Sequence, residues 1–321
     1  MKRLIIRRLL QVIPILLGMS LLSFIIIQSA PGDYFTQLKL NPEISPETIE
    51  RMRQSFGLDR NVFVQYLYWL KNLCTFNFGV SFAYHIPVLT LIRFRLTNTL
   101  CLALFSLVVS WIIALPFGVL AGYREKGILD RIASFFAYLS VSIPSFFLAL
   151  LFVYWVSQHS FLPLGGTRSV FGPSVSTWKV FSDYLVHMLV PGIILVCVNV
   201  GWLFRLMRNN FAEVYRSPYI VAAWAKGLPA RTVVFKHAFR NALNPMFTIL
   251  GLEIGGLLNG AALVEIICGW PGMGSLILEA VLSKDLFLVM GSLVIGGFLL
   301  ILGNLIGDLL LLFFDPRIRI A

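Results

Sequence analysis

The chain has 321 residues, of which 58% are hydrophobic and only 13% are charged. Its mean hydropathy of +0.84 excludes a globular protein with a water-facing surface and indicates a polytopic membrane protein. The net charge of +11 at pH 7 could indicate nucleic-acid binding, but the basic residues flank apolar segments and form no stripe on a soluble domain. Membrane orientation explains this placement better, so we expect no nucleic-acid partner.

The first apolar segment, residues 9–27, follows a basic start with four Lys and Arg side chains. A signal peptide begins in the same way, but an apolar core of 19 residues is longer than a usual signal core. Ala30 is the only small residue that suits a cleavage site, and Pro31 follows it. We therefore predict a cytoplasmic N-terminus and a retained first transmembrane helix within residues 1–30.

A polar region follows at residues 31–97, with seven basic and five acidic side chains. We expect a short helix from Pro46 to about Gly57 and an aromatic, amphipathic helix over residues 61–71. Residues 72–92 carry no charge, but they contain too many polar and helix-breaking residues to span hydrocarbon. The sequence therefore predicts a long external region between the first and second transmembrane helices.

Five further apolar segments complete an all-α membrane protein with six predicted transmembrane helices. Residues 98–314 form a five-helix core, and residues 315–321 form a tail. These segments cover about 96–123, 132–157, 184–204, 241–264 and 286–307, and the last one continues to 314.

Six spans place both termini on one side of the membrane. That side carries 16 basic residues, against three on the other side when the long first loop is left aside. Because positive charge in short loops marks the cytoplasmic face, we expect both termini and the loop 208–240 in the cytoplasm.

The loop between the fourth and fifth spans contains a short predicted helix, from Pro218 to Lys226. Ser217 suits the N-cap, Pro218 suits the first helical position, and Gly227 suits the left-handed residue after the last turn. Small side chains in the segment 222–225 would let another protein approach this backbone closely. Leu228-Pro229 then begins a second helix.

The pattern Ala222-Ala223-x-x-x-Gly227 resembles the cytoplasmic EAA loop of permease subunits of binding-protein-dependent ABC importers. The longer string AKGLPARTVVFKHAFRNALNP resembles the oligopeptide, dipeptide and nickel branch of that family. The resemblance implies a type I importer permease fold, in which this helix is the coupling helix that docks into a groove on a partner ATPase. An ordinary amphipathic loop helix is the alternative. The candidate coupling residues are Ser217, Tyr219, Ala222, Ala223, Lys226, Gly227 and Arg231.

Two departures from the family pattern stand in this loop. Val221 occupies the position of the acidic residue that gives the motif its name, which removes any acid-mediated contact there. Arg240 stands where many relatives outside the branch carry proline. The branch itself tolerates both residues, so the assignment stands.

A second family motif lies after the fifth span. Glu265 followed by Trp270-Pro271-Gly272-Met273-Gly274 resembles the external turn of the family, and residues 275–282 can form a short helix at the interface. The site residues predicted for this turn are Glu265, Trp270, Pro271, Gly272 and Gly274.

Motifs for catalysis are absent from the sequence: there is no Gly-Lys dipeptide of a phosphate-binding loop, and no H-E-x-x-H, G-x-S-x-G or C-x-x-C. We therefore expect a non-catalytic membrane subunit with no cofactor or metal of its own. ATP and Mg²⁺ are expected on partner ATPase subunits.

The candidates for a translocation pathway are the polar residues Glu253, Asn199 and Asn259 within the spans. An acid deep in a span is costly and normally faces a cavity or a partner. Glu253 could attract a cationic group such as the amino terminus of a peptide, or it could be a protonated or paired packing residue. The sequence leaves both interpretations open.

The resemblance implies that the chain is one of two permease subunits, which we expect to form a heterodimer in the cytoplasmic (inner) membrane of a bacterium. Two ABC ATPase subunits and an external substrate-binding protein would complete an importer for short peptides. An importer of a nickel chelate or another small solute, from the same family, is the nearest alternative. A channel or carrier that needs no ATPase is the alternative from another class, and it should show an ion site near the midplane.

Overall fold

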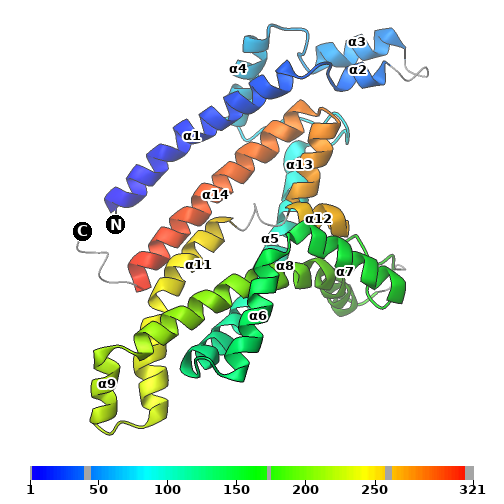
Figure 1. Ribbon diagram of the computed structural model, residues 1–321. Coiled ribbons are helices and arrows are strands. Elements are labelled where there is room, and N and C mark those ends of the chain that lie inside the picture. Colours follow the sequence, from blue (N-terminus) through cyan, green and yellow to red (C-terminus); the bar gives the residue numbers. More distant parts are fainter. Residues whose placement is uncertain (1, 40–44, 172–174, 257–261, 315–321) are drawn as a thin grey trace. The chain divides into compact units, whose positions relative to one another are not determined.

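The computed structural model describes residues 2–39, 45–171, 175–256 and 262–314 (Figure 1). These residues form helices joined by turns, and the only extended pairing among them is an isolated bridge between Val80 and Pro87. The chain divides into two compact units. Unit 1 comprises Met1–Asn98 and Gly272–Ile301, and unit 2 comprises Thr99–Pro271 and Leu302–Ala321.

Four helices in the described part of the chain are long and apolar enough to cross a membrane. The number rises to as many as six if each of two broken helix pairs counts as one span. The four helices are α1 (Lys2–Ser29), α5 (Val88–Tyr123), α8 (Thr177–Tyr215) and α14 (Leu286–Phe314). The predicted all-α membrane protein is confirmed.

The third predicted span, at 132–157, is not one continuous helix. It consists of α6 (Ile128–Ser142) and α7 (Ser145–His159), which meet at an angle of 103°. Pro144 has no backbone N–H to continue the helix, and its ring disfavours helical geometry at Ile143. Ile143 accordingly has φ −88° and ψ 123°, which is extended. Pro144 therefore causes the bend between α6 and α7.

The fifth predicted span, at 241–264, contains α10 (Arg240–Ala242), α11 (Asn244–Gly256) and the start of α12 (Ala262–Cys268). Residues 257–261 lie outside the described part of the chain. The second broken pair consists of α12 and α13 (Met273–Leu282), which are joined by the Trp-Pro-Gly turn.

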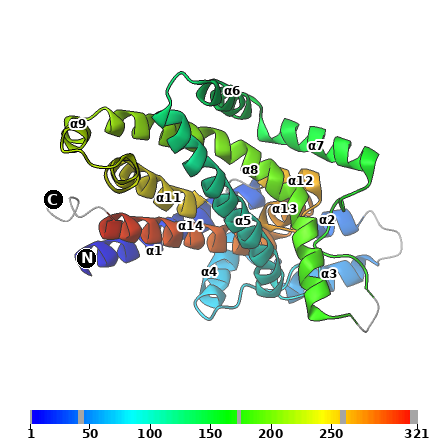
Figure 2. The ribbon, with the colours of Figure 1, turned by 90° about the horizontal axis from the view of Figure 1, so that it is seen from below.

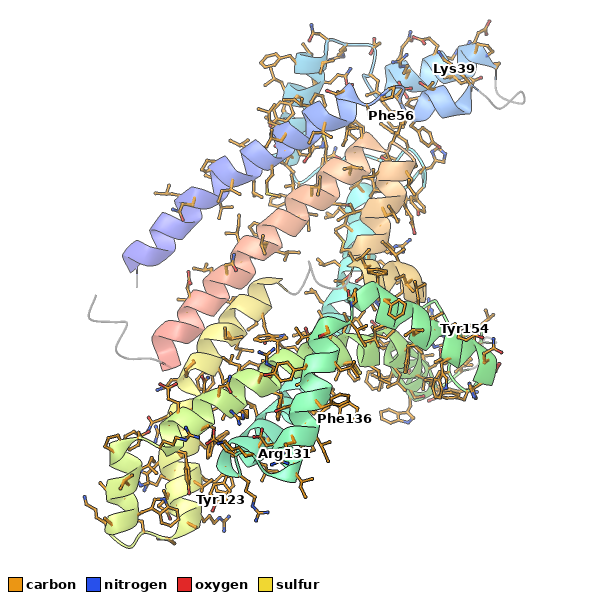
Figure 3. All side chains as sticks on the ribbon, in the orientation of Figure 1. Lys39, Phe56, Tyr123, Arg131, Phe136 and Tyr154 are labelled. Atoms are coloured by element: carbon orange, nitrogen blue, oxygen red, sulfur yellow. The ribbon has the colours of Figure 1, made fainter. Side chains whose placement is uncertain are left out.

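The described residues of unit 1 contain three helices in the polar region after α1, of which the second and third are the two that the sequence predicts. They are α2 (Tyr34–Leu38), α3 (Pro46–Ser55) and α4 (Val62–Leu73). Ser45 caps α3 by accepting from the N–H of Thr48, and Asn61 caps α4 by accepting from the N–H of Phe63. Aromatic side chains from these helices, from α1 and from α14 form one core, in which Figure 3 labels Phe56.

The buried carboxylate of Asp285 joins two parts of unit 1. Its Oδ2 accepts from Ser81 Oγ at 2.5 Å and from the N–H of Ala83 at 3.1 Å. Its Oδ1 accepts from the N–H of Leu288 at 3.1 Å, in the first turn of α14. One side chain therefore caps α14 and fixes the loop before α5.

Unit 2 is built around α8, which is 39 residues long and packs against α6, α7 and α12. Figure 2 shows α5 crossing α8, with α6 and α7 alongside. The crossing needs small residues: a Cβ at Gly122 of α5 would lie 2.7 Å from the carbonyl oxygen of Arg208. Glycine here permits the backbone of one helix to touch the other.

Candidate coupling and pathway sites

The loop after α8 forms the short helix α9 (Pro218–Ala225), with nearly the bounds that the sequence predicts. Pro218 begins the helix, and the N-cap residue Ser217 is extended. The Ser217 hydroxyl does not cap α9, however, and instead donates to the carbonyl oxygen of Val214 at 2.5 Å in the last turn of α8.

The C-terminal end of α9 is closed by a Schellman motif. Gly227 has φ +73°, and its N–H donates to the carbonyl oxygen of Trp224 at 2.9 Å. The next N–H, of Leu228, donates to the carbonyl oxygen of Ala223 at 3.4 Å. This pair of bonds satisfies carbonyls that the end of a helix leaves without intrahelical partners. Gly227 therefore occupies the left-handed position that the sequence predicts.

The two faces of α9 differ. Ile220 and Ala223 face inward and join a core with Phe211 of α8 and Val233. The opposite face, which we call the outer face of α9, consists of exposed side chains, and Val221 is 60% exposed. Its residues are Tyr219, Val221, Ala222, Trp224, Ala225 and Lys226.

Ala223 needs a correction among the candidate coupling residues. It is only 7% exposed, so its side chain holds α9 to the rest of unit 2 and offers no surface to a partner. Ala222, Lys226 and Gly227 are exposed. Tyr219 is exposed as well, and its hydroxyl accepts a hydrogen bond from Asn241 at 3.0 Å.

The segment after α9 begins at Pro229 and contains a π-helix, η1 (Thr232–Phe239), before α10. Figure 1 shows it beside α9 at the end of α8. Val233 and Ala238 are five residues apart and both fully buried, as the wider turn of a π-helix allows. Arg231 precedes η1 and is exposed. The sequence predicts a helix here, but nothing in it signals the π geometry.

The candidate pathway acid Glu253 lies on α11 and is paired. The indole N–H of Trp111, on α5, donates to Glu253 Oε2 at 2.7 Å. Asn199 lies on α8 and is partly buried, and no hydrogen bond joins it to Glu253 in the part of the chain that the structure describes. Asn259 is outside the described residues. Sequence reasoning missed Trp111, although an indole N–H within an apolar span needs an acceptor.

Buried side chains hold the turn after α12 in place. Glu265 is fully buried, and it accepts from Thr99 Oγ1 at 2.6 Å. Its carbonyl oxygen accepts from the N–H of Trp270 at 2.8 Å. The Trp270 ring is buried against Tyr184, with ring centroids 5.5 Å apart. These two motif residues hold the turn in place, and neither is available at the surface.

The remaining residues of this turn lead into α13. Pro271 precedes Gly272, which is the extended N-cap of α13, and Gly274 lies in the first turn of that helix. Glycine at 272 is not required by a left-handed conformation, since its φ is −107°.

Fold and site together define a polytopic α-helical membrane protein with a small helix exposed in the loop between two spans. Residues 114–320 match a protein family described as the inner membrane component of binding-protein-dependent transport systems. Residues 1–103 match the N-terminal part of membrane components of such systems. The chain belongs to this family, and the resemblance predicted from residues 222–227 is confirmed.

Several curated relatives align with the chain over nearly its full length. The oligopeptide transport system permease protein AppB of Bacillus subtilis (strain 168) is 38% identical over 317 residues, which are 98% of each chain. The dipeptide transport system permease protein DppB of Alkalihalophilus pseudofirmus is 33% identical over 327 residues, again 98% of each chain. DppB of Escherichia coli (strain K12) is 33% identical over 336 residues, with 99% of each chain covered.

Proposed function

We propose that the protein is a permease subunit of an ATP-driven importer for short peptides and forms half of the translocation pathway. Membership of the binding-protein-dependent transport family supports a permease. Relatives named as oligopeptide and dipeptide transport permeases support peptides as the cargo. An importer for a nickel chelate or another small solute is the second candidate within the family.

The outer face of α9 is the observation that carries the coupling role. Val221 and Trp224 expose apolar surface on a short helix that is anchored from behind by Ile220 and Ala223. Exposed apolar groups on a rigid helix suit a groove on another protein. A partner ATPase docks there, and its groove is apolar opposite Val221, because this position has no carboxylate to pair with a cation.

The two partner ATPase subunits bind ATP and Mg²⁺ and hydrolyse the ATP. Their closure moves α9 and shifts the permease between an inward-open and an outward-open state, because the nucleotide state favours one of two arrangements. A sister permease supplies the other half of the pathway. An external binding protein delivers the peptide, and both termini of this chain lie in the cytoplasm of the bacterium.

Glu253 serves as the polar contact for a cationic cargo group within this half of the pathway. The Trp111 indole orients the carboxylate through its 2.7 Å hydrogen bond. Uptake of peptides with different charge by a Glu253→Gln variant tests this role. Rates should fall for peptides with a free amino terminus or a basic side chain, and unchanged rates for all peptides would refute it.

Cross-linking tests the docking of α9. A cysteine at exposed Ala222 should form a bond with a cysteine in the ATPase groove when the complex is assembled, in good yield. A cysteine at buried Ala223 is the matched control, one residue away, and should react poorly. Equal yields at both positions, or no product at Ala222, would contradict docking through the outer face.

A further inference from the structure

A cluster of charged side chains lies where the turn between α5 and α6 meets the end of α8. The acid Asp130 is at its centre, in the first turn of α6, and its side chain is only 6% exposed. Arg208 of α8 binds it with two parallel hydrogen bonds, Nε to Oδ1 at 3.1 Å and Nη2 to Oδ2 at 2.8 Å.

Asp130 has two further donors, both local. The N–H of Lys126 donates to Oδ2 at 2.8 Å, and the hydroxyl of Ser134 donates to Oδ1 at 3.3 Å. A carboxylate at a helix N-terminus is also stabilised by the helix dipole. Asp130 therefore connects the turn 124–127, α6 and α8, and both of its carboxylate oxygens accept hydrogen bonds.

The cluster continues toward α9. Glu125 accepts a hydrogen bond from Arg216, which lies between the last residue of α8 and the N-cap of α9. Glu125 also lies 3.6 Å from Nη1 of Arg208. The rings of Tyr123 and Tyr215 pack edge to face nearby, with centroids 5.3 Å apart. Figure 3 labels Tyr123 and Arg131, which flank this turn.

Among the described residues the cluster has three ion pairs, and the pair of Arg216 with Glu125 differs in strength from the pair of Arg208 with Asp130. Arg216 is 68% exposed, and ion pairs that water surrounds contribute little. The pair of Asp130 and Arg208 is bidentate and largely shielded, which makes it both stronger and more directional. Removal of either partner leaves the other charge uncompensated in a partly buried place. We therefore expect Asp130 and Arg208 to form the contact that links the end of α8 to the turn between α5 and α6.

We propose that Asp130 and Arg208 are positioning residues that carry the displacement of α9 to α5 and α6. This inference rests on the proposed coupling function. α9 is fixed to the end of α8 by the core around Ile220 and Phe211, so the end of α8 follows α9 when the partner moves it. The bidentate pair makes the turn between α5 and α6 follow α8, and the α6–α7 helix pair moves with that turn.

A double-mutant cycle on the complete importer tests this inference. The variants are Asp130→Asn, Arg208→Gln and the double variant. The measured quantity is the ratio of peptide imported to ATP hydrolysed in proteoliposomes. Asparagine at 130 keeps an acceptor for the N–H of Lys126, so the turn before α6 keeps its hydrogen bond. Each single variant should lower the ratio by between about twofold and thirtyfold, the usual range for a residue within a coupling path. The double variant should lose no more than the worse single variant, because the two residues act as one link.

Arg216→Gln is the matched control, since it removes an arginine from the exposed pair of the same cluster and should leave the ratio near that of the unmodified protein. Losses that multiply in the double variant, or a single variant with an unchanged ratio, would overturn the inference. It would also be overturned if neither single variant assembled with the ATPase, because the pair would then serve folding alone. Failure of the unmodified complex to import with ATP would instead refute the proposed function.

Discussion

Gly227, the left-handed residue that ends α9, offers a sharp test of the need for an intact α9, because substitutions at this position differ only in backbone strain. Gly227 has φ +73°, and a Cβ built on it meets nothing within 4 Å. A substitution therefore creates no clash with a neighbour. Placing an L-residue in this conformation costs about 1–2 kcal/mol, which is roughly a fivefold to thirtyfold change in the population of the closed helix end. Asparagine tolerates the conformation far better than other residues do, and a β-branched side chain tolerates it worst.

The expected order of helix-end stability is therefore glycine, asparagine, alanine, valine. Hydrogen exchange of the purified protein measures it directly, because the amides of Gly227 and Leu228 donate the two bonds of the Schellman motif. These amides should exchange roughly fivefold to thirtyfold faster in Gly227→Val than in the unmodified chain. Gly227→Asn is the control and should exchange nearly as slowly as glycine.

The same series should order the activity of the assembled importer. Gly227→Val should abolish or strongly reduce transport, while the external binding protein still binds its peptide. Equal exchange rates for valine and asparagine at this position would refute the argument from backbone strain. Normal transport by a valine variant whose helix end is open would refute the need for an intact α9.

Three further predictions concern packing and polar contacts. Asp285→Ala leaves three donors without their acceptor, at about 1–3 kcal/mol for each buried group, and should lower the thermal stability of the purified protein; Asp285→Asn keeps an acceptor and should lose less. Gly122→Ala should destabilise by about 1–3 kcal/mol, since its Cβ would stand 2.7 Å from a backbone oxygen of α8, whereas Gly296→Ala in α14 has open space and should be neutral or stabilising. Trp111→Phe removes the donor to Glu253 and should impair import of cationic peptides in the same direction as Glu253→Gln, with no added loss in the double variant. Equal stability of the two Asp285 variants, a harmless alanine at 122, or additive losses at Trp111 and Glu253 would contradict these assignments.

The bounds of α9 could be predicted because local chemistry determines them. Pro218 and Gly227 suit the first helical position and the left-handed residue at the end, and both lie there. Ser217 lies at the predicted N-cap position, although its hydroxyl bonds to a carbonyl oxygen of α8 instead. Which side of α9 faces inward could not be predicted, because its middle is apolar or small on every side. Ala223 is buried and Ala222 exposed, although the two are the same residue type.

The break of the third span had a signal in the sequence that periodicity alone overlooks. Pro144 interrupts an apolar stretch without lowering its hydropathy, so the segment 132–157 reads as one span although its helix bends by 103°. Hydropathy measures whether a segment suits a membrane, and it does not report the direction of the chain.

Pairs that join distant residues were beyond sequence reasoning. Asp130 and Arg208 are 78 positions apart, and Trp111 and Glu253 are 142 apart. Each of these side chains has an ordinary interpretation by itself, as a helix cap, a membrane anchor or a packing residue. Only the fold brings a donor and an acceptor together, and it is the pairing that suggests a role.

In the proposed function, a separate ATPase drives transport through α9. Uptake of a labelled peptide into proteoliposomes tests it most directly, with this chain, its sister permease, the binding protein and the ATPases present or absent. Uptake should occur only when the ATPases and ATP are both supplied, and it should be lost when α9 is disrupted by Gly227→Val. Peptide uptake at full rate without the ATPases would contradict it.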